Sequence, residues 1–273
     1  MTTKSLLRWF PALLMLLCMS GVRADVPFDL LAATPPGSWQ RQESVSTDDA
    51  GRQVLAVIET ALLAEEQRNG VDFVWVQTEI QPYRLTTAGE REPYGDRTVM
   101  QTLLQRRVLA AGTFGGLDNL RRFGSEVIYQ VGEATPMRVV GAGQIAATIA
   151  GLTGANTTPV LTPLGSESLK TAAGRFDTTR LGSQFRSQGQ LLGQSLSVDV
   201  QGSVWLSPVV PFGLVQSHST EVTNGIASST RTELVAYGSA GAVSKISGAP
   251  THFEIPAELR GLFGGLQGWF GGG

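Results

Sequence analysis

The sequence predicts a mostly β protein of the α+β class, built from a curved antiparallel sheet or half-barrel with one or two packed helices. Charged residues make up only 16% of the 273-residue chain, below the roughly 25% usual for globular proteins. Glycine is abundant, with 33 residues, and the second half of the chain contains short segments in which apolar and polar residues alternate. Such segments, separated by Gly-containing turns, are typical of an antiparallel sheet that curves or closes on itself.

The first 24 residues have the organisation of a secretory signal peptide. Lys4 and Arg8 precede an apolar run over residues 9–19, and small side chains stand before a cleavage position after Ala24. The run is too short to span a bilayer, for which about 20 apolar residues are needed, and no later segment approaches that length. We expect residues 1–24 to be removed, no transmembrane segment to remain and the mature protein to reside in the periplasm.

Removal of the signal peptide leaves an acidic chain without cysteine. Three of the 21 basic residues lie in residues 1–24, so that 18 remain against 23 acidic residues, a net charge of −5. The single cysteine, Cys18, is lost as well, and it follows Leu17, where lipidation signals carry Gly, Ala or Ser. Disulfides and thiolate chemistry are therefore not expected. Without a Lys/Arg cluster, we expect no binding to nucleic acid.

Residues 25–250 are expected to form a single antiparallel β domain. Residues 25–53, which include the stretch TPPGSWQ, are interpreted as loop and edge strand. Residues 54–64 fit a helix about as well as a buried strand. Because Asn69-Gly70 is a strong hairpin signal and a clear strand follows it over residues 72–80, we favour two antiparallel strands joined at that turn.

The strand over residues 72–80 has two different faces, because successive side chains of a strand point in opposite directions. One face carries Val74, Val76, Thr78 and Ile80. The other carries Phe73, Trp75, Gln77 and Glu79. The second face is therefore aromatic at one end and polar at the other.

A helix is predicted over residues 98–109, followed by another strand over residues 126–131. The helix prediction rests on apolar residues that fall on one helical stripe. These are Val99, Met100, Leu103, Leu104 and Val108. The stretch GTFGG then ends the helix.

The second half of the chain predicts a meander with turns at Ala173-Gly174 and Asn224-Gly225. The stretch SLSVDVQGSVWLSP alternates cleanly. One face consists of Val198, Val200, Gly202, Val204 and Leu206, and the other of Ser197, Asp199, Gln201, Ser203 and Trp205. A tryptophan thus again interrupts an otherwise polar face. The stretches VVPFGLVQSHST and SSTRTELVAYG supply the remaining strands.

A glycine-rich insertion near residues 141–165 resembles a dinucleotide-binding turn. After a short strand, Gly141, Gly143 and Ala146 have the G-x-G-x-x-A spacing. A dinucleotide site also needs a βαβ unit and an acidic residue about 20 positions further on. The first acidic residue is Glu167, in a stretch that we interpret as loop, and a β meander surrounds the motif. We therefore expect no NAD and no other cofactor, and interpret the insertion as a connection that packs on the sheet.

No catalytic or metal site is predicted. The chain has two histidines, His218 and His252, which stand alone without the spacing of a zinc pair. No G-x-S-x-G nucleophile motif and no phosphate-binding loop occur. We expect a protein that is not an enzyme.

The tryptophans on polar strand faces have two interpretations. They either pack beneath a helix, such as the one over residues 98–109, or line a groove for an apolar ligand, since such sites have mostly apolar walls.

The tail over residues 251–273 is glycine-rich and amphipathic. Its apolar residues recur at helical spacing. They are Leu259, Leu262, Phe263, Leu266, Trp269 and Phe270. Because glycine costs a helix about 1 kcal/mol relative to alanine, the segment is either a disordered tail or becomes ordered by docking on its own groove, a partner or a membrane interface.

The chain resembles the periplasmic lipoprotein-carrier group, of the LolA/LolB type, and related uncharacterised exported proteins. The resemblance rests on strand patterns over about residues 45–240 and on phrases such as EVIYQVGEATPMRV and VWLSPVVPFGLV. It implies a half-barrel that holds acyl chains on a concave apolar face beneath a helical lid. It supplies no catalytic motif.

We therefore predict a periplasmic protein that binds an apolar small molecule, a lipid or a lipoprotein acyl chain. The candidate wall residues are Phe73, Trp75, Tyr129, Trp205 and Phe212. Burial of alkyl surface would supply the affinity, at about 0.8 kcal/mol per methylene. The alternative is a cell-envelope structural or interaction protein that docks on a partner through its C-terminal tail.

Overall fold

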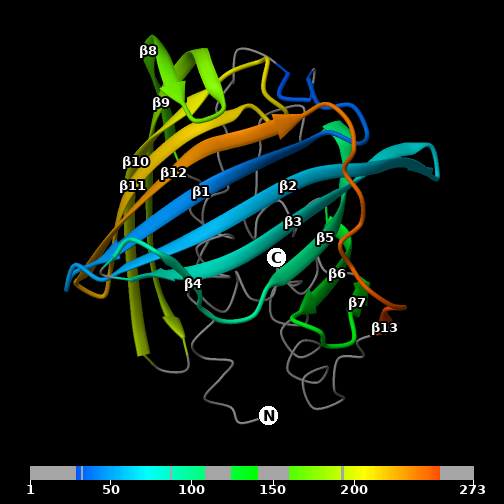
Figure 1. The fold of residues 1–273 in the computed structure, drawn as a ribbon, viewed down its shortest axis with the longest axis horizontal. Helices are drawn as coiled ribbons and strands as arrows, with labels where there is room; N and C mark the ends of the chain where they lie inside the picture. Colours follow the sequence, from blue (N-terminus) through cyan, green and yellow to red (C-terminus); the bar gives the residue numbers. More distant parts are fainter. Residues whose placement is uncertain are drawn as a thin grey trace, which may run out of the picture.

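The computed structural model describes residues 29–31, 33–86, 88–107, 124–140, 160–191 and 194–252, and these form one large β-sheet (Figure 1). The strands are β1 (Trp39–Asp48), β2 (Gln53–Arg68), β3 (Val71–Leu85), β4 (Arg91–Pro93), β5 (Thr98–Gln105), β6 (Gly124–Val131), β7 (Met137–Val140), β8 (Val160–Thr171), β9 (Gly174–Leu191), β10 (Gln194–Leu206), β11 (Leu214–Thr223), β12 (Ile226–Gly238) and β13 (Thr251–His252). Their order across the sheet is β13-β7-β6-β5-β3-β2-β1-β12-β11-β10-β9-β8, with β4 paired to β3.

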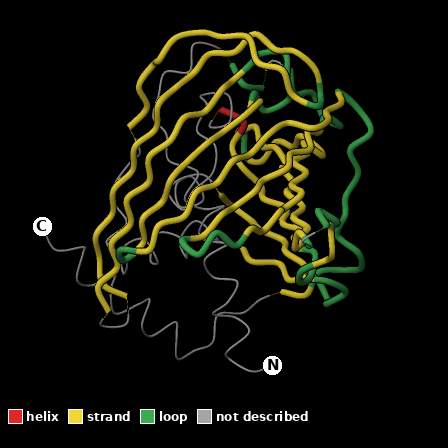
Figure 2. Tube along the Cα trace, turned by 60° about the vertical axis from the view of Figure 1, so that its left-hand side comes forward, coloured by secondary structure: helices red, strands yellow, loops and turns green. Residues whose placement is uncertain are grey.

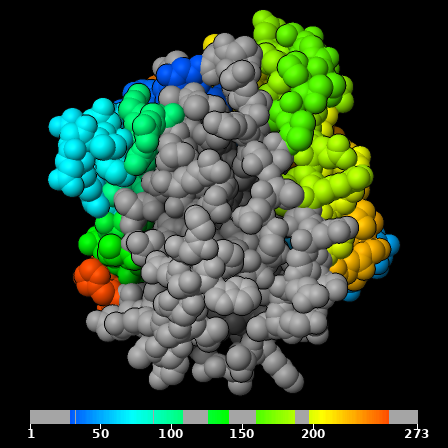
Figure 3. All heavy atoms as spheres, turned by 180° about the vertical axis from the view of Figure 1, so that it is seen from behind, coloured from blue at the N-terminus to red at the C-terminus, as the bar shows by residue number. Residues whose placement is uncertain are grey.

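The sheet is strongly curved. Figures 1 and 2 show it as an open arch, with β8–β11 turned away from β1–β3. Seen from behind, β5–β7 and β8–β10 occupy opposite sides of the molecule (Figure 3). We call the convex side the outer face and the concave side the inner face. The prediction of a mostly β, curved antiparallel sheet is confirmed.

The helix predicted over residues 98–109 is wrong. Residues 98–105 form β5, which pairs antiparallel with β3 and β6. Both faces of β5 carry apolar side chains, so that its residues also fit a helical stripe. Only Arg106 and Arg107 are helical among the described residues, and packed helices are not found there. Among all the residues that the structure describes, no helix has the length and apolar composition needed to span a bilayer.

The predicted hairpins are confirmed. Asn69-Gly70 joins β2 to β3, and Asn224-Gly225 joins β11 to β12; all four residues have positive φ, between 50° and 85°. Asparagine and glycine adopt this conformation at little cost, which explains the strength of the signal. The β8–β9 hairpin also turns where expected, with Thr171 paired to Gly174. Residues 160–165 of the predicted insertion belong to β8, while residues 141–159 lie outside the described residues.

The first strand is central. The sequence predicted an edge strand here, and that prediction is wrong. β1 pairs with β2 on one side and with β12 on the other, both antiparallel. Trp39 lies opposite both Ala61 and Gly238. A side chain at Gly238 would place its Cβ 2.7 Å from the Trp39 indole nitrogen, so that glycine is needed for this close approach. β1 therefore joins the two halves of the sheet.

Three small apolar clusters pack against the sheet with help from two loops. The loop after β10 contributes Val210 and Phe212, and the segment before β1 contributes Leu30 and Leu31. The backbone N–H of Phe212, which has a φ of 59°, donates to the Thr34 hydroxyl at 2.9 Å. The two loops are thereby tied to each other.

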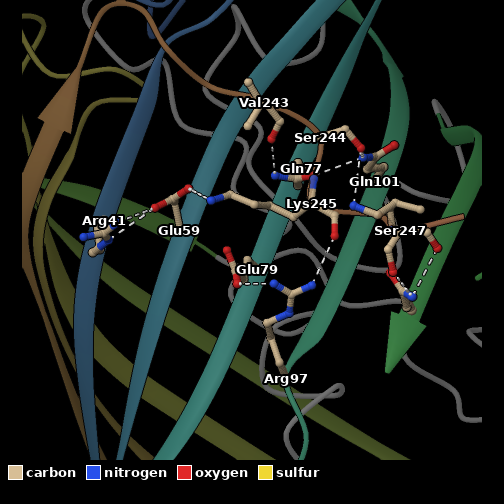
Figure 4. Close-up of polar contacts among 12 residues, drawn as sticks. Arg41, Glu59, Gln77, Glu79, Arg97, Gln101, Val243, Ser244, Lys245 and Ser247 are labelled. Atoms are coloured by element: carbon tan, nitrogen blue, oxygen red, sulfur yellow. Dashed lines mark hydrogen bonds and ion pairs between the residues drawn. The ribbon is translucent and has the colours of Figure 1, made fainter. Parts of the chain in front are cut away.

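A segment that we call the strap, residues 239–250, crosses the outer face from the end of β12 to β7 (Figures 1 and 4). Buried amide side chains of three strands bind it. Gln77 donates to the Val243 carbonyl at 3.3 Å and accepts from the Lys245 N–H at 2.8 Å. Gln101 donates to the Ser244 hydroxyl at 2.7 Å. Gln130 accepts from the Ser247 N–H at 2.9 Å, after which β13 pairs in parallel with β7.

Replacement of Gln77 tests how firmly the strap is held. Gln77→Leu is expected to lower the free energy of unfolding by about 1–3 kcal/mol, because the strap's N–H and carbonyl lose their buried partner. The measurement is equilibrium unfolding in urea. The control is Gln81→Leu, on the same strand and face, whose amide donates only to the adjacent Pro82 carbonyl; it is expected to change stability by less than about 0.5 kcal/mol. Equal losses in the two variants would contradict this role of Gln77.

Candidate functional site

The inner face of β2, β3, β5, β6 and β7 carries apolar side chains with threonines, such as Thr78 and Thr102, between them. Gln77 and Gln101 bind the strap on the outer face, so their neighbours along each strand point inward. The strand register extends this assignment from strand to strand. The resulting set is half-buried, and we call it the inner apolar patch: Ile58, Val76, Ile80, Met100, Leu104, Tyr129, Met137 and Val139. The patch is continuous across β5, β6 and β7, since Met100 lies opposite Tyr129, which lies opposite Met137. On β3 the residue opposite Met100 is Thr78.

A polar stripe borders the patch along β1 and β12. Ser44 and Thr232 are joined by a hydrogen bond of 3.0 Å between their hydroxyls, and Ser46 and Thr230 by one of 2.9 Å. Gln42 donates to the Leu214 carbonyl at 3.2 Å. These groups satisfy one another across the strands. These hydrogen bonds therefore largely offset the free-energy cost of burying the polar groups.

The five predicted wall residues are not brought together. Phe73 and Trp75 share the outer face with Gln77, since they alternate with Val74 and Val76. Trp205 also lies on the outer face, opposite Gln216, but on the other flank of the sheet. The remaining two are Tyr129, on the inner face, and Phe212, which is buried against Leu62 and Val74. Val76 and Leu104 of the patch pack against this cluster. Only Tyr129 belongs to the inner apolar patch.

Trp75 borders a cavity of about 380 Å³ on the outer face. Its indole N–H donates to Glu66 at 3.2 Å. Beside it, the buried carboxylate of Glu126 lies 3.3 Å from Arg68 and 3.0 Å from Arg138. Arg68 also contacts Glu66. The two acids and two bases neutralise one another, so the cavity has no net charge to offer a ligand.

Trp205 has a similar environment on the other flank. Its indole N–H donates to Glu167 at 2.6 Å, and the Arg180 guanidinium lies 5.0 Å from the ring centroid. The side chain is buried beneath these partners. Both tryptophans are thus bound by a carboxylate of their own sheet, and the helix expected to cover Trp75 is instead β5, with Leu103 opposite the indole.

Other predicted sites fall outside the described residues. These are the six docking residues Leu259, Leu262, Phe263, Leu266, Trp269 and Phe270, and the glycine motif at Gly141, Gly143 and Ala146. His218 is exposed on β11 and His252 ends β13. In the described part of the chain, no three His, Cys, Asp or Glu side chains are grouped so as to hold a metal ion.

The inner apolar patch contains one aromatic residue, Tyr129, so that a prediction based on aromatic residues does not find it. The alternation in residues 72–80 had already separated Val76 and Ile80 from Trp75. That signal was sufficient to find the patch on β3. On β5, Met100 and Leu104 were assigned to a helix, which hid their shared face with β3.

No protein-family model and no curated protein matches the chain. Two solved structures are similar to it: a candidate lipoprotein from Parabacteroides distasonis, at 13% identity, and a candidate exported protein with a YmcC-like fold from Bacteroides fragilis, at 10% identity. Each comparison covers 77% of this chain and 99% of the other, with a TM-score of 0.36. A likeness of this degree assigns no function, and neither protein is described as a lipoprotein carrier.

Tyr129 provides a spectroscopic marker for the inner face. Burial raises the pKa of its phenol above the usual value of 10.0, because the charged phenolate is poorly solvated there. Its hydroxyl lies 3.7 Å from the Met137 sulfur.

Tyr129→Phe is expected to remove the phenol that titrates above pH 10 in the folded protein. Above that pH the unfolded chain loses the proton while the folded protein retains it, so that this group lowers stability as pH rises. The measurement is an ultraviolet titration of phenolate in the native protein and the variant. The control is the same titration of both proteins unfolded in urea. In neither of them should a phenol titrate later than the others. A native curve unchanged by the substitution would contradict the assignment.

Proposed function

We propose that this protein is an exported, non-enzymatic protein that binds an apolar chain, such as the acyl chain of a lipid, against the inner apolar patch. The supporting observation is the concentration of half-buried apolar side chains on one concave face. In a single sheet, alternation would permit these residues on either side. Here five neighbouring strands place them on the same side.

The composition of the patch suits an alkyl ligand. Its eight side chains carry no charged group at neutral pH. Met100 and Met137 are flexible and polarizable, and such side chains adapt to chains of different shape. Tyr129 adds a single hydroxyl. Contact with alkyl groups would contribute about 0.8 kcal/mol per buried methylene.

The two faces of the sheet differ in a way that favours this assignment. The outer face of the same strands also carries apolar side chains, such as Leu103, but it includes Glu59 and Glu79, which pair with Arg41 at 2.8 Å and with Arg97 at 3.3 Å (Figure 4). Charged pairs are suited to water contact, whereas the part of an apolar patch that remains in contact with water favours a partner that covers it. The signal-like leader supports export, and the lipid would then be met outside the cytoplasm.

Two neighbouring residues of β2 allow a matched test. Ile58 lies on the inner face and Val57 on the outer face, and both are half-buried. Ile58→Asn is expected to weaken binding of the fluorescent fatty acid cis-parinaric acid about tenfold, through lost apolar contact of about 1–2 kcal/mol. Val57→Asn is expected to leave the affinity within about twofold, because it changes the opposite face.

Fluorescence titration of full-length protein, exported and purified from the periplasm, measures both affinities. Thermal unfolding of each variant establishes that it is folded. Absence of saturable binding by the native protein would overturn the proposal. So would equal weakening in the two folded variants, since it would show that the inner face is not where the chain binds.

A further inference from the structure

A second hollow lies on the outer face at the opposite flank of the sheet. It has a volume of about 440 Å³ and spans β8, β9, β10 and β11. Its polar lining includes Thr162, Gln184, Gln201, Ser203 and His218, around the backbone of Gly182. We call it the outer hollow. Its volume falls within the range of about 300–1,000 Å³ found for small-molecule sites.

The strand register makes this lining continuous. Thr162 lies opposite Gly182, which lies opposite Ser203, which lies opposite His218. These four residues therefore form a row across four strands on one face. Gln184 and Gln201, also opposite each other, form a second row next to the first. Gly182 carries no side chain, and the space above it is occupied by the side chain of Leu164.

The lining side chains are free to bind a ligand. Thr162, Gln184, Gln201 and His218 are exposed, and within the described part of the chain none of them makes a side-chain hydrogen bond. Carboxamides and hydroxyls each offer both donors and acceptors, and a neutral imidazole offers one of each. Ser203 accepts from Arg180 at 3.3 Å and keeps a donor. The hollow thus presents mixed donors and acceptors without a charge of its own.

The charges around the hollow are paired with one another. Arg186 contacts Asp199 at 2.7 Å, and Arg231 contacts Glu233 at 3.1 Å. These pairs leave no unbalanced charge to attract an ionic ligand.

The rim of the hollow is apolar. Val160 is 63% exposed and Leu164 is 52% exposed. Leu164 reaches over Gly182, since its Cδ1 lies 3.2 Å from where a Cβ on that glycine would stand. Exposed aliphatic groups beside uncharged polar groups match a ligand that has C–H faces and hydroxyl edges.

We infer that the outer hollow binds a neutral oligosaccharide. Its hydroxyls would exchange hydrogen bonds with Gln184, Gln201 and His218, and its C–H face would lie on Val160 and Leu164. The hollow and the inner apolar patch lie on opposite faces, so that the two sites take different ligands and are tested separately.

The test is titration calorimetry of the full-length exported protein with maltoheptaose, cellohexaose and chitohexaose, and with an oligogalacturonate as the charged comparison. At least one neutral oligosaccharide is expected to bind saturably. The double variant Gln184→Ala/Gln201→Ala is expected to raise its Kd about tenfold or more. Gly182→Val is expected to raise the Kd similarly, because the new side chain occupies the floor of the hollow. The variant is expected to fold, since the flexible Leu164 can move to admit that side chain.

The matched control is Thr220→Ala. Thr220 is exposed on the same strand and face as His218 but does not line the hollow. Its replacement should leave the Kd within about twofold. The inference is overturned if no neutral oligosaccharide binds, if only the oligogalacturonate binds, or if the hollow variants bind as tightly as Thr220→Ala.

Discussion

The pairing of β1 with both β2 and β12 is the constraint on which the rest of the sheet depends. β1 is joined to β2 by a short turn, whereas β12 is contributed from the far end of the chain. Hydrogen bonds between Ser44 and Thr232 and between Ser46 and Thr230 reinforce the second pairing on the inner face. Without the β1–β12 pairing, β1–β7 and β8–β12 would be two smaller sheets. The two sheets would then not be held around a shared concave surface.

The two faces of the curved sheet carry different sets of side chains. The inner face collects apolar side chains on both flanks and places hydroxyls and amides between them, where they bond to one another. The outer face carries paired charges, and two of its tryptophans, Trp75 and Trp205, each donate to a glutamate. These aromatic residues therefore stabilise the outer surface. The apolar ligand that the sequence assigned to Trp75 is, in our proposal, bound by aliphatic residues on the opposite face of the same strand.

Local signals predicted the local parts of this structure. Asn69-Gly70 and Asn224-Gly225 located their hairpins because the required positive φ values select those residue types. Alternation separated the faces of β3 and β10 correctly, but it contains no information on which face curves inward. That depends on the strap and on strand order, which bring together residues far apart in the chain. β5 was mistaken for a helix because apolar residues on both faces of a strand satisfy a helical stripe as well.

The long separation between β1 and its second partner also determines the order in which the protein forms. Ser44 and Thr232 are 188 residues apart, and closing so long a loop costs entropy before any contact compensates for it. Proteins dominated by such distant pairings fold slowly. Until β12 has paired with β1, one edge of β1 has unpaired backbone N–H and C=O groups that another strand could bind. The strap follows β12 and needs glutamines from three assembled strands, so that its docking marks the completion of folding.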